Sequence, residues 1–198
     1  MGEAMKRKIG VMGACGGDLR SEVMEKAHRL GEAIARRDCV LVTGACPGLP
    51  HVAVQGAKAA GGLVVGISPG LSLDEHLYKY EGETDGYDVI VYTGSGLMGR
   101  EITTIRTCDI ITIVGGRTGT LGEFAIAYDE GRLIGVLSGT GGITGVIEQI
   151  LAVADKQTGA QVVYESDPIR LVDQLLEVYR TQHYKKPSCF CAEKGPQG

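Results

Sequence analysis

Ile110-Ile-Thr-Ile-Val-Gly-Gly-Arg-Thr-Gly-Thr-Leu-Gly-Glu123 is the stretch of sequence that decides the fold. Its first five residues are β-branched and mostly apolar, which is typical of a buried strand. Gly115, Gly116 and Gly119 then allow the backbone to come close to a ligand, and the helix that follows presents free N–H groups and the positive end of its dipole. The pattern predicts a phosphate-binding turn, with the carboxyl group of Glu123 in the first turn of the helix.

Similar short apolar runs recur along the chain with helical segments between them. They are rich in Val and Ile, as expected for parallel strands covered by helices on both sides. The alternation predicts an α/β fold with a doubly wound, mainly parallel sheet of about seven strands, of the Rossmann-like kind. The predicted strands are 8–12, 40–43, 63–67, 89–92, 109–114, 133–137 and 161–164.

The segments between the strands have helical periodicity. Apolar stripes are formed by Val23, Ala27, Leu30 and Ile34, and by Val172, Leu175, Leu176 and Tyr179. Asp167 can cap the last helix, Pro168 suits its first position, and the helix is expected to end near Arg180. We therefore predict one Rossmann-like nucleotide-binding domain over residues 1–180, followed by a polar C-terminal tail over residues 181–198.

Composition excludes several classes of function. The net charge is -4, and no basic face is evident that could neutralise a nucleic-acid backbone. No signal peptide and no apolar run of membrane length is evident, so the expected location is the cytoplasm, with no membrane partner. The six cysteines lack regular spacing and are expected to be small buried residues in a reducing compartment, not a disulfide framework. Cys189 and Cys191, with His183 nearby, have too weak a spacing to predict a metal site.

Glycine-rich turns follow four of the predicted strands, at 13–17, 44–49, 94–99 and 115–119. Ligands of such sheets gather at the carboxyl ends of the strands. Each turn alone can be purely structural, but four together predict a site for a small phosphorylated ligand. No dinucleotide fingerprint and no Walker sequence is present. The residues expected to contact the ligand are Gly13, Ala14, Gly44, Gly48, Leu49, Gly115, Gly116, Arg117, Thr118, Gly119 and Thr120.

Arg100 is expected at the start of a helix, where its guanidinium can pair with a phosphate or carboxylate. The alternative is an ion pair with Glu101 or with an acid across the cleft. For Glu123 the alternative is a capping box over residues 120–123, in which the glutamate bonds back to the N-cap amide. His51 and the tyrosines at 78, 80 and 87 are interpreted mainly as packing residues.

The segment from Gly115 to Glu123 resembles the Gly-Gly-x-Gly-Thr-x-x-Glu signature of the Lonely Guy (SLOG) family of Rossmann-like nucleotide-binding proteins, once misnamed lysine decarboxylases. The segment 42–49 resembles the second glycine turn of the family, and 64–69 resembles its third strand and proline. Arg100 stands nine residues before Asp109, as the family's arginine does before its equivalent acid. The resemblance extends in the same order over most of the chain.

This resemblance implies a phosphoribohydrolase that cleaves the N-glycosidic bond of cytokinin nucleoside 5′-monophosphates, with Glu123 and Arg100 as catalytic residues and with no metal or required cofactor. It also implies a homodimer or higher homo-oligomer. The extra residue at Arg117-Thr118 and the acid Glu101 in place of a lysine resemble instead the subgroup that includes molybdenum cofactor carrier proteins. The alternative is therefore a non-catalytic carrier or sensor of a nucleotide or a molybdopterin-type ligand, and a third is an oligomer with a vestigial site.

Overall fold

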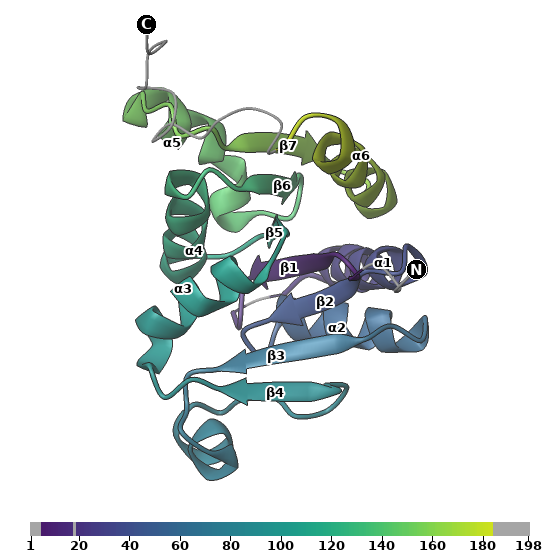
Figure 1. Ribbon diagram of the computed structural model, residues 1–198, viewed down its shortest axis with the longest axis vertical. Helices are drawn as coiled ribbons and strands as arrows, with labels where there is room; N and C mark the ends of the chain where they lie inside the picture. The colour runs from purple at the N-terminus through teal and green to yellow at the C-terminus, as the bar shows by residue number, and fades with distance from the viewer. Residues whose placement is uncertain (1–4, 18, 184–198) are drawn as a thin grey trace, which may run out of the picture.

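The computed structural model describes residues 5–17 and 19–183 and shows one seven-stranded sheet between two layers of helices (Figure 1). All neighbouring strands are parallel, and their order is β4-β3-β2-β1-β5-β6-β7. The predicted fold class is therefore confirmed. The strands are β1 (Lys8–Gly13), β2 (Val40–Thr43), β3 (Val64–Ser68), β4 (Val89–Tyr92), β5 (Ile110–Val114), β6 (Leu133–Leu137) and β7 (Gln161–Glu165).

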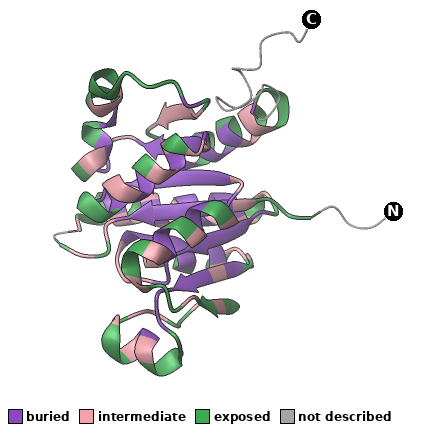
Figure 2. Ribbon diagram, turned by 60° about the vertical axis from the view of Figure 1, so that its left-hand side comes forward, coloured by how far each residue is buried: buried purple, intermediate pink, exposed green. Residues whose placement is uncertain are grey.

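Two layers of helices cover the sheet because successive strand residues point to opposite faces. Ile110 and Val114 of β5 pack with α1, α2 and α6, whereas Ile111 and Ile113 pack with α3, α4 and α5. Figure 2 shows the buried strands between more exposed helices. The helices are α1 (Ser21–Arg36), α2 (Leu49–Ala59), α3 (Gly96–Thr107), α4 (Thr118–Asp129), α5 (Ile147–Ala154) and α6 (Pro168–Thr181), with a π-helix η1 (Glu75–Lys79) and a 3₁₀-helix η2 (Gly142–Gly145).

The predicted apolar stripes are the buried faces of α1 and α6. The four stripe residues of α1 are buried, and Val172 and Leu175 of α6 are buried beside them. Asp167 caps α6 as predicted, because its Oδ1 accepts hydrogen bonds from the amides of Ile169 and Arg170, each at 2.9 Å. The side chain of His183 after this helix is also buried. The rest of the predicted tail, with Cys189 and Cys191, lies outside the described residues.

Two glycines lie within helices and not in the glycine-rich turns to which the sequence analysis assigned a role. Gly31 of α1 lies against the backbone of α2, where an added Cβ would overlap the carbonyl group of Ala53. Gly56 of α2 lies in the same way against the backbone of His28. Small residues let two helix backbones approach closely, so these glycines bring α1 and α2 together over the sheet.

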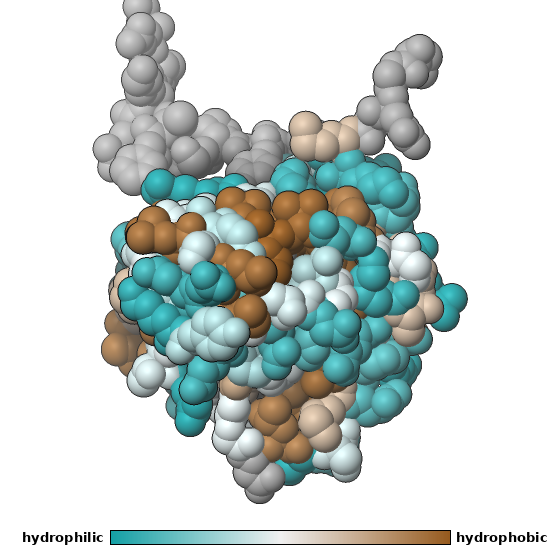
Figure 3. All heavy atoms as spheres, turned by 90° about the horizontal axis from the view of Figure 1, so that it is seen from below, coloured by the Kyte–Doolittle hydropathy of each residue, from teal (hydrophilic) through white to brown (hydrophobic). Residues whose placement is uncertain are grey.

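The strands at the two edges of the sheet, β4 and β7, are less buried than the sequence predicts. The side chains of β4 are only partly covered, and Val89 is 52% exposed. Figure 3 looks toward the β4 and η1 end of the molecule and shows apolar patches among hydrophilic side chains. An apolar run in the sequence does not reveal whether a neighbouring strand lies on both of its sides, so edge strands and central strands look alike in sequence.

The expected homodimer or higher homo-oligomer stays a prediction.

No helix within the described ranges is both long enough and apolar enough to span a bilayer.

Candidate functional site

The candidate site lies at the carboxyl ends of β1 and β5, where the strand order reverses. The glycine turns after β1, β2 and β5 meet there, as predicted, because these three strands are neighbours. The turn after β4 does not line the site, which corrects the prediction that all four turns converge. Strand β4 is three strands away from β1, about 14 Å at ~4.8 Å per strand. Its helix α3 instead brings Arg100 and Glu101 to the pocket.

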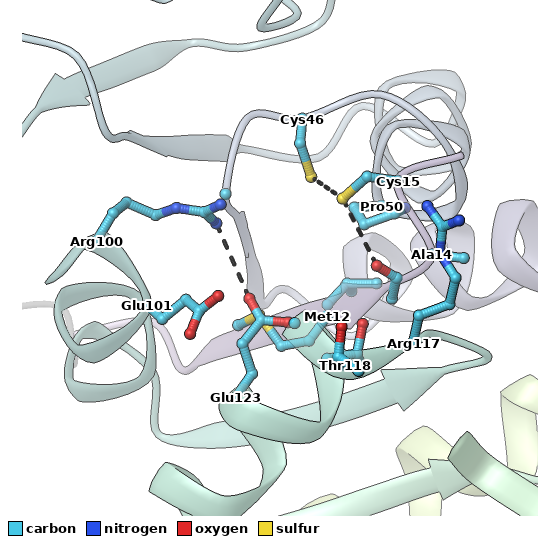
Figure 4. A pocket seen from close by; sticks show the side chains of 15 residues that line it. Met12, Ala14, Cys15, Cys46, Pro50, Arg100, Glu101, Arg117, Thr118 and Glu123 are labelled. Atoms are coloured by element: carbon cyan, nitrogen blue, oxygen red, sulfur yellow. Dashed lines mark hydrogen bonds and ion pairs between the residues drawn. The ribbon is translucent and has the colours of Figure 1, made fainter. Parts of the chain in front are cut away.

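A cavity of about 330 Å³ opens at this point, and Figure 4 shows the side chains that surround it. It contains both predicted catalytic residues and seven of the predicted ligand contacts. These are Glu123 and Arg100, with Gly13, Ala14, Gly44, Arg117, Thr118, Gly119 and Thr120. The lining also includes residues that sequence reasoning did not assign to the site: Val11, Met12, Cys15, Cys46, Pro50 and Glu101.

A second cavity of about 190 Å³ adjoins the first, with Ala14 and Arg117 common to both. Its lining contains three further predicted contacts, Leu49, Gly115 and Gly116. Gly48 lines neither cavity. It precedes α2 with a φ of 83°, and an added Cβ would overlap the carbonyl oxygen of Ala14. Gly48 therefore allows the two glycine turns to pack closely.

The N-terminus of α4 faces the larger cavity. Arg117 occupies the N-cap position, and no side chain caps the helix in the part of the chain that the structure describes. The first N–H groups of a helix have no acceptor within it, so the amides at Thr118, Gly119 and Thr120 can bind an anion. The amide of Gly115 differs, because it donates to Oγ1 of Thr140 at 2.9 Å. Any phosphate would therefore bind the first turn of α4 and not the start of the glycine turn.

Glu123 and Arg100 both lie further into their helices than predicted. Helix α4 begins at Thr118, so Glu123 is in its second turn and a capping box over residues 120–123 does not form. Gly116 adopts a φ of 99° and completes the turn before Gly119, which leaves Gly119 free to be helical. Arg100 is the fifth residue of α3.

The side chains of Arg100 and Glu123 point toward each other across the cavity (Figure 4). Nη1 of Arg100 lies 3.9 Å from Oε1 of Glu123, and the two side chains are 8% and 10% exposed. This pairing with an acid across the cleft is one of the alternatives that the sequence left open. Gly44 makes room for it, since an added Cβ would overlap the guanidinium of Arg100.

Two buried polar atoms at Arg100 and at its neighbour Glu101 have no hydrogen-bond partner within the described structure. They are Nε of Arg100 and Oε2 of Glu101. Unpartnered buried polar atoms are costly, and they are typical of sites that a ligand completes. Two residues that line the cavity therefore each keep a buried polar atom without a partner in the described structure.

Burial is the main cause of the shifted pKa values of the two carboxyl groups at the cavity, those of Glu123 and Glu101. It raises the pKa of Glu123 to about 8; the Arg100 guanidinium opposes this shift, and the nearby Glu101 and Cys15 add to it. Burial also raises the pKa of Glu101, again against the effect of Arg100. Glu123 is thus mostly protonated at neutral pH, and can donate a hydrogen bond or a proton.

Cys15 and Cys46 are the main residues of the site that sequence reasoning missed. Their Sγ atoms lie 2.8 Å apart at the cavity. A signal was present in the sequence: both turns contain the tripeptide Gly-Ala-Cys, at 13–15 and 44–46. In contrast, His51 and Tyr87 are packing residues as expected, because their rings lie 6.3 Å apart and the Tyr87 hydroxyl is 2.9 Å from Oγ1 of Thr43. The same interpretation is wrong for Tyr78, which is 82% exposed.

Comparison with known proteins identifies the family of the chain. The model of the SLOG cluster4 family matches residues 6–172. An uncharacterised protein of Archaeoglobus fulgidus is 35% identical over 130 residues, which are 66% of this chain and 79% of that protein.

Two solved structures are similar in fold and sequence. The molybdenum cofactor binding protein from the phototrophic bacterium Rippkaea orientalis is 28% identical with a TM-score of 0.73, over 90% of this chain and all of that one (100%). The molybdenum cofactor carrier protein of Chlamydomonas reinhardtii is 28% identical with a TM-score of 0.70, over 87% of this chain and 99% of that one. Since the family model spans most of the sequence, the chain belongs to the SLOG cluster4 family.

Proposed function

We propose that this protein binds a small phosphorylated ligand of the nucleotide or pterin type and holds it without turnover, as a carrier or sensor. The observation that carries the proposal is the uncapped N-terminus of α4, which opens into a cavity of about 330 Å³ beside Arg117. Backbone amides, a helix dipole and a guanidinium together suit a phosphate group. The rest of the ligand would extend toward Arg100 and Glu101, which line the far side of the same cavity and can bind its polar edge.

Two arguments favour a carrier. Proteins named as binding or carrying the molybdenum cofactor share the fold over nearly the full chain. In addition, the raised pKa of Glu123 leaves this group mostly neutral at pH 7 in the unliganded cavity. A neutral carboxyl group stabilises a developing oxocarbenium charge poorly, which weakens the case for glycosidic cleavage.

The second candidate is hydrolysis of the N-glycosidic bond in a nucleoside 5′-monophosphate. It is favoured by the buried pair of Glu123 and Arg100 that faces the cavity. A phosphate held at α4 would place the ribose near this pair, where a protonated Glu123 can donate a proton to the departing base.

Ligand titration with product analysis tests both candidates. The protein is titrated with AMP, N6-substituted AMPs and the molybdenum cofactor, with calorimetry and thermal unfolding as readouts, and the mixtures are analysed for free base. We expect binding and no release of base. Arg117→Ala should weaken binding by about 10- to 100-fold, because a charged hydrogen bond to phosphate is worth ~1.5–3 kcal/mol.

Arg36→Ala, which removes an exposed arginine from the last turn of α1, is the matched control and should bind as the wild type does. Release of base that Glu123→Gln abolishes while binding persists would establish the hydrolase instead. Absence of binding by all three ligand classes would refute the proposed function.

A further inference from the structure

The two Gly-Ala-Cys turns place two thiols side by side at the mouth of the cavity. Cys15 follows β1 and Cys46 follows β2, and these strands are neighbours in the sheet. The Sγ atoms are 2.8 Å apart, which is closer than van der Waals contact, and Figure 4 shows the two side chains directed toward each other. The turns are further joined by a hydrogen bond of 2.8 Å from the amide of Leu49 to the carbonyl of Ala14.

The two thiols differ in access and acidity. Cys15 is exposed, which corrects the expectation of buried cysteines, whereas Cys46 is only partly exposed. The hydrogen bond from Cys46 lowers the pKa of Cys15 to about 7, with help from Arg100 and Arg117, whereas the same contact and burial raise the pKa of Cys46. An accessible thiolate next to a less acidic thiol is the arrangement of an attacking and a resolving cysteine.

The other cysteines in the described ranges have neither property. Cys39 and Cys108 are buried, and burial raises the pKa of each thiol. Their Sγ atoms donate to backbone carbonyl oxygens, of Arg37 and Thr104 respectively, as Cys15 also does to Gly13, but neither lies against a second thiol of the described ranges. They therefore serve as internal controls for thiol reactivity.

We propose that Cys15 and Cys46 form a redox-modification site, a dithiol that low-molecular-weight disulfides convert reversibly into a disulfide bridge between the two glycine turns. The Cys15 thiolate attacks one sulfur of the reagent and releases one thiolate, which leaves a mixed disulfide on Cys15. Cys46 then loses its proton and attacks Sγ of Cys15, releasing the second thiolate. The protein dithiol is oxidised by two electrons, the reagent disulfide is reduced to two thiols, and an excess of dithiol reductant reverses the reaction.

This site goes beyond the proposed ligand-binding function and does not depend on it. Closing the bridge shortens the Sγ–Sγ separation from 2.8 Å to ~2.05 Å, a small movement for two side chains on turns. The bridge would tie together two of the three glycine turns that frame the cavity. It would also close a loop between residues 31 positions apart.

The test uses the full chain with Cys189 and Cys191 replaced by serine, so that the cysteines of the described ranges are the only thiols. Reduced, folded protein is incubated with oxidised glutathione at pH 8, quenched with acid and examined by intact mass and peptide mapping. We expect a product lighter by two hydrogen atoms, with a Cys15–Cys46 crosslink and a midpoint of thermal unfolding raised by about 5–10 °C.

Variants separate the two steps. Cys46→Ser should accumulate a glutathione adduct on Cys15, and Cys15→Ser should react at least about tenfold more slowly. Cys108→Ser is the matched control and should form the crosslink as the parent does. The proposal is overturned if the parent keeps a stable glutathione adduct without the crosslink, or if the crosslink forms only after denaturation. Both results are read from protein mass, so they do not depend on whether a phosphorylated ligand binds.

Discussion

Replacing Glu123 by glutamine should stabilise the protein at neutral and alkaline pH. The carboxyl group of Glu123 is buried, and its nearest cationic atom, Nη1 of Arg100, is 3.9 Å away, beyond hydrogen-bond distance. Burial therefore dominates, and the folded state holds the group protonated to about pH 8. Glutamine has nearly the same shape and is neutral at every pH, so it fills the same space without the cost of ionisation.

The magnitude follows from the linkage between protonation and folding. In the unfolded chain Glu123 ionises near its ordinary pKa of 4.5, whereas in the folded protein it ionises near 8. The unfolded state therefore loses its proton first, and the free energy of unfolding falls as pH rises through this window. The window spans 3.5 pH units (8 minus 4.5). At about 1.4 kcal/mol per unit the full window corresponds to about 5 kcal/mol, and the wild type has lost about 4 kcal/mol of this by pH 8, where the group in the folded protein is half ionised.

Urea titrations of wild type and Glu123→Gln from pH 4.5 to 8.5 measure this difference. The two proteins should be similarly stable near pH 4.5, and the variant should gain an advantage that grows to about 4 kcal/mol at pH 8. In thermal unfolding at pH 8 this is about 10 °C for a chain of this length. Glu148→Gln removes an exposed carboxyl group as the control for charge alone. A variant that is less stable than wild type at pH 8, or an advantage independent of pH, would show that Arg100 keeps Glu123 ionised and would refute the reasoning.

Three further predictions concern stability, each measured by urea unfolding. Gly44→Ala places a Cβ on the Arg100 guanidinium and should lower the free energy of unfolding by about 1–3 kcal/mol. In the control Gly145→Ala the added Cβ meets open space, and the free energy of unfolding should change by no more than about 0.5 kcal/mol. Equal effects would contradict the close packing at Gly44. Gly31→Ala should lower the free energy of unfolding by at least about 3 kcal/mol, because the added Cβ meets the backbone of α2 and not a side chain that can move. An unchanged free energy of unfolding would mean that α1 and α2 can move apart at no cost. Asp167→Ala should cost about 1 kcal/mol at pH 7 through the lost cap of α6. Because hydrogen bonds from backbone amides lower the pKa of Asp167, that cost should disappear as pH falls through the folded-state pKa, and a cost that persists in acid would contradict the cap.

Much of the fold could be predicted because its signals are local. The predicted strands at 40–43, 89–92 and 133–137 coincide with β2, β4 and β6. The predictions for β1, β5 and β7 differ by one residue at one end, and the prediction for β3 is displaced by one residue at both ends. Runs of β-branched residues bounded by glycines specify such strands without reference to distant parts of the chain. The start of α4 was placed too late, because the sequence does not reveal which glycine takes the positive φ. Gly115 and Gly116 both take it, and Gly119 joins the helix.

The candidate site was predictable only in part. Parallel strands end at one edge of the sheet, so the turns after β1, β2 and β5 could be expected to lie together. The distance of the turn after β4 and the meeting of Cys15 with Cys46 depend on strand order. Strand order depends on the face of the sheet over which each connecting helix crosses. A single sequence does not specify that face.

By itself the sequence determined the parallel α/β architecture and the glycine turns, because backbone freedom and hydrophobic periodicity act within a few residues. The tertiary structure alone decided that Arg100 reaches across the cavity to Glu123, that burial leaves this acid mostly protonated at neutral pH, and that two thiols meet at the cavity mouth. These properties arise from desolvation and from contacts between residues far apart in the chain, which exist only after the sheet has assembled.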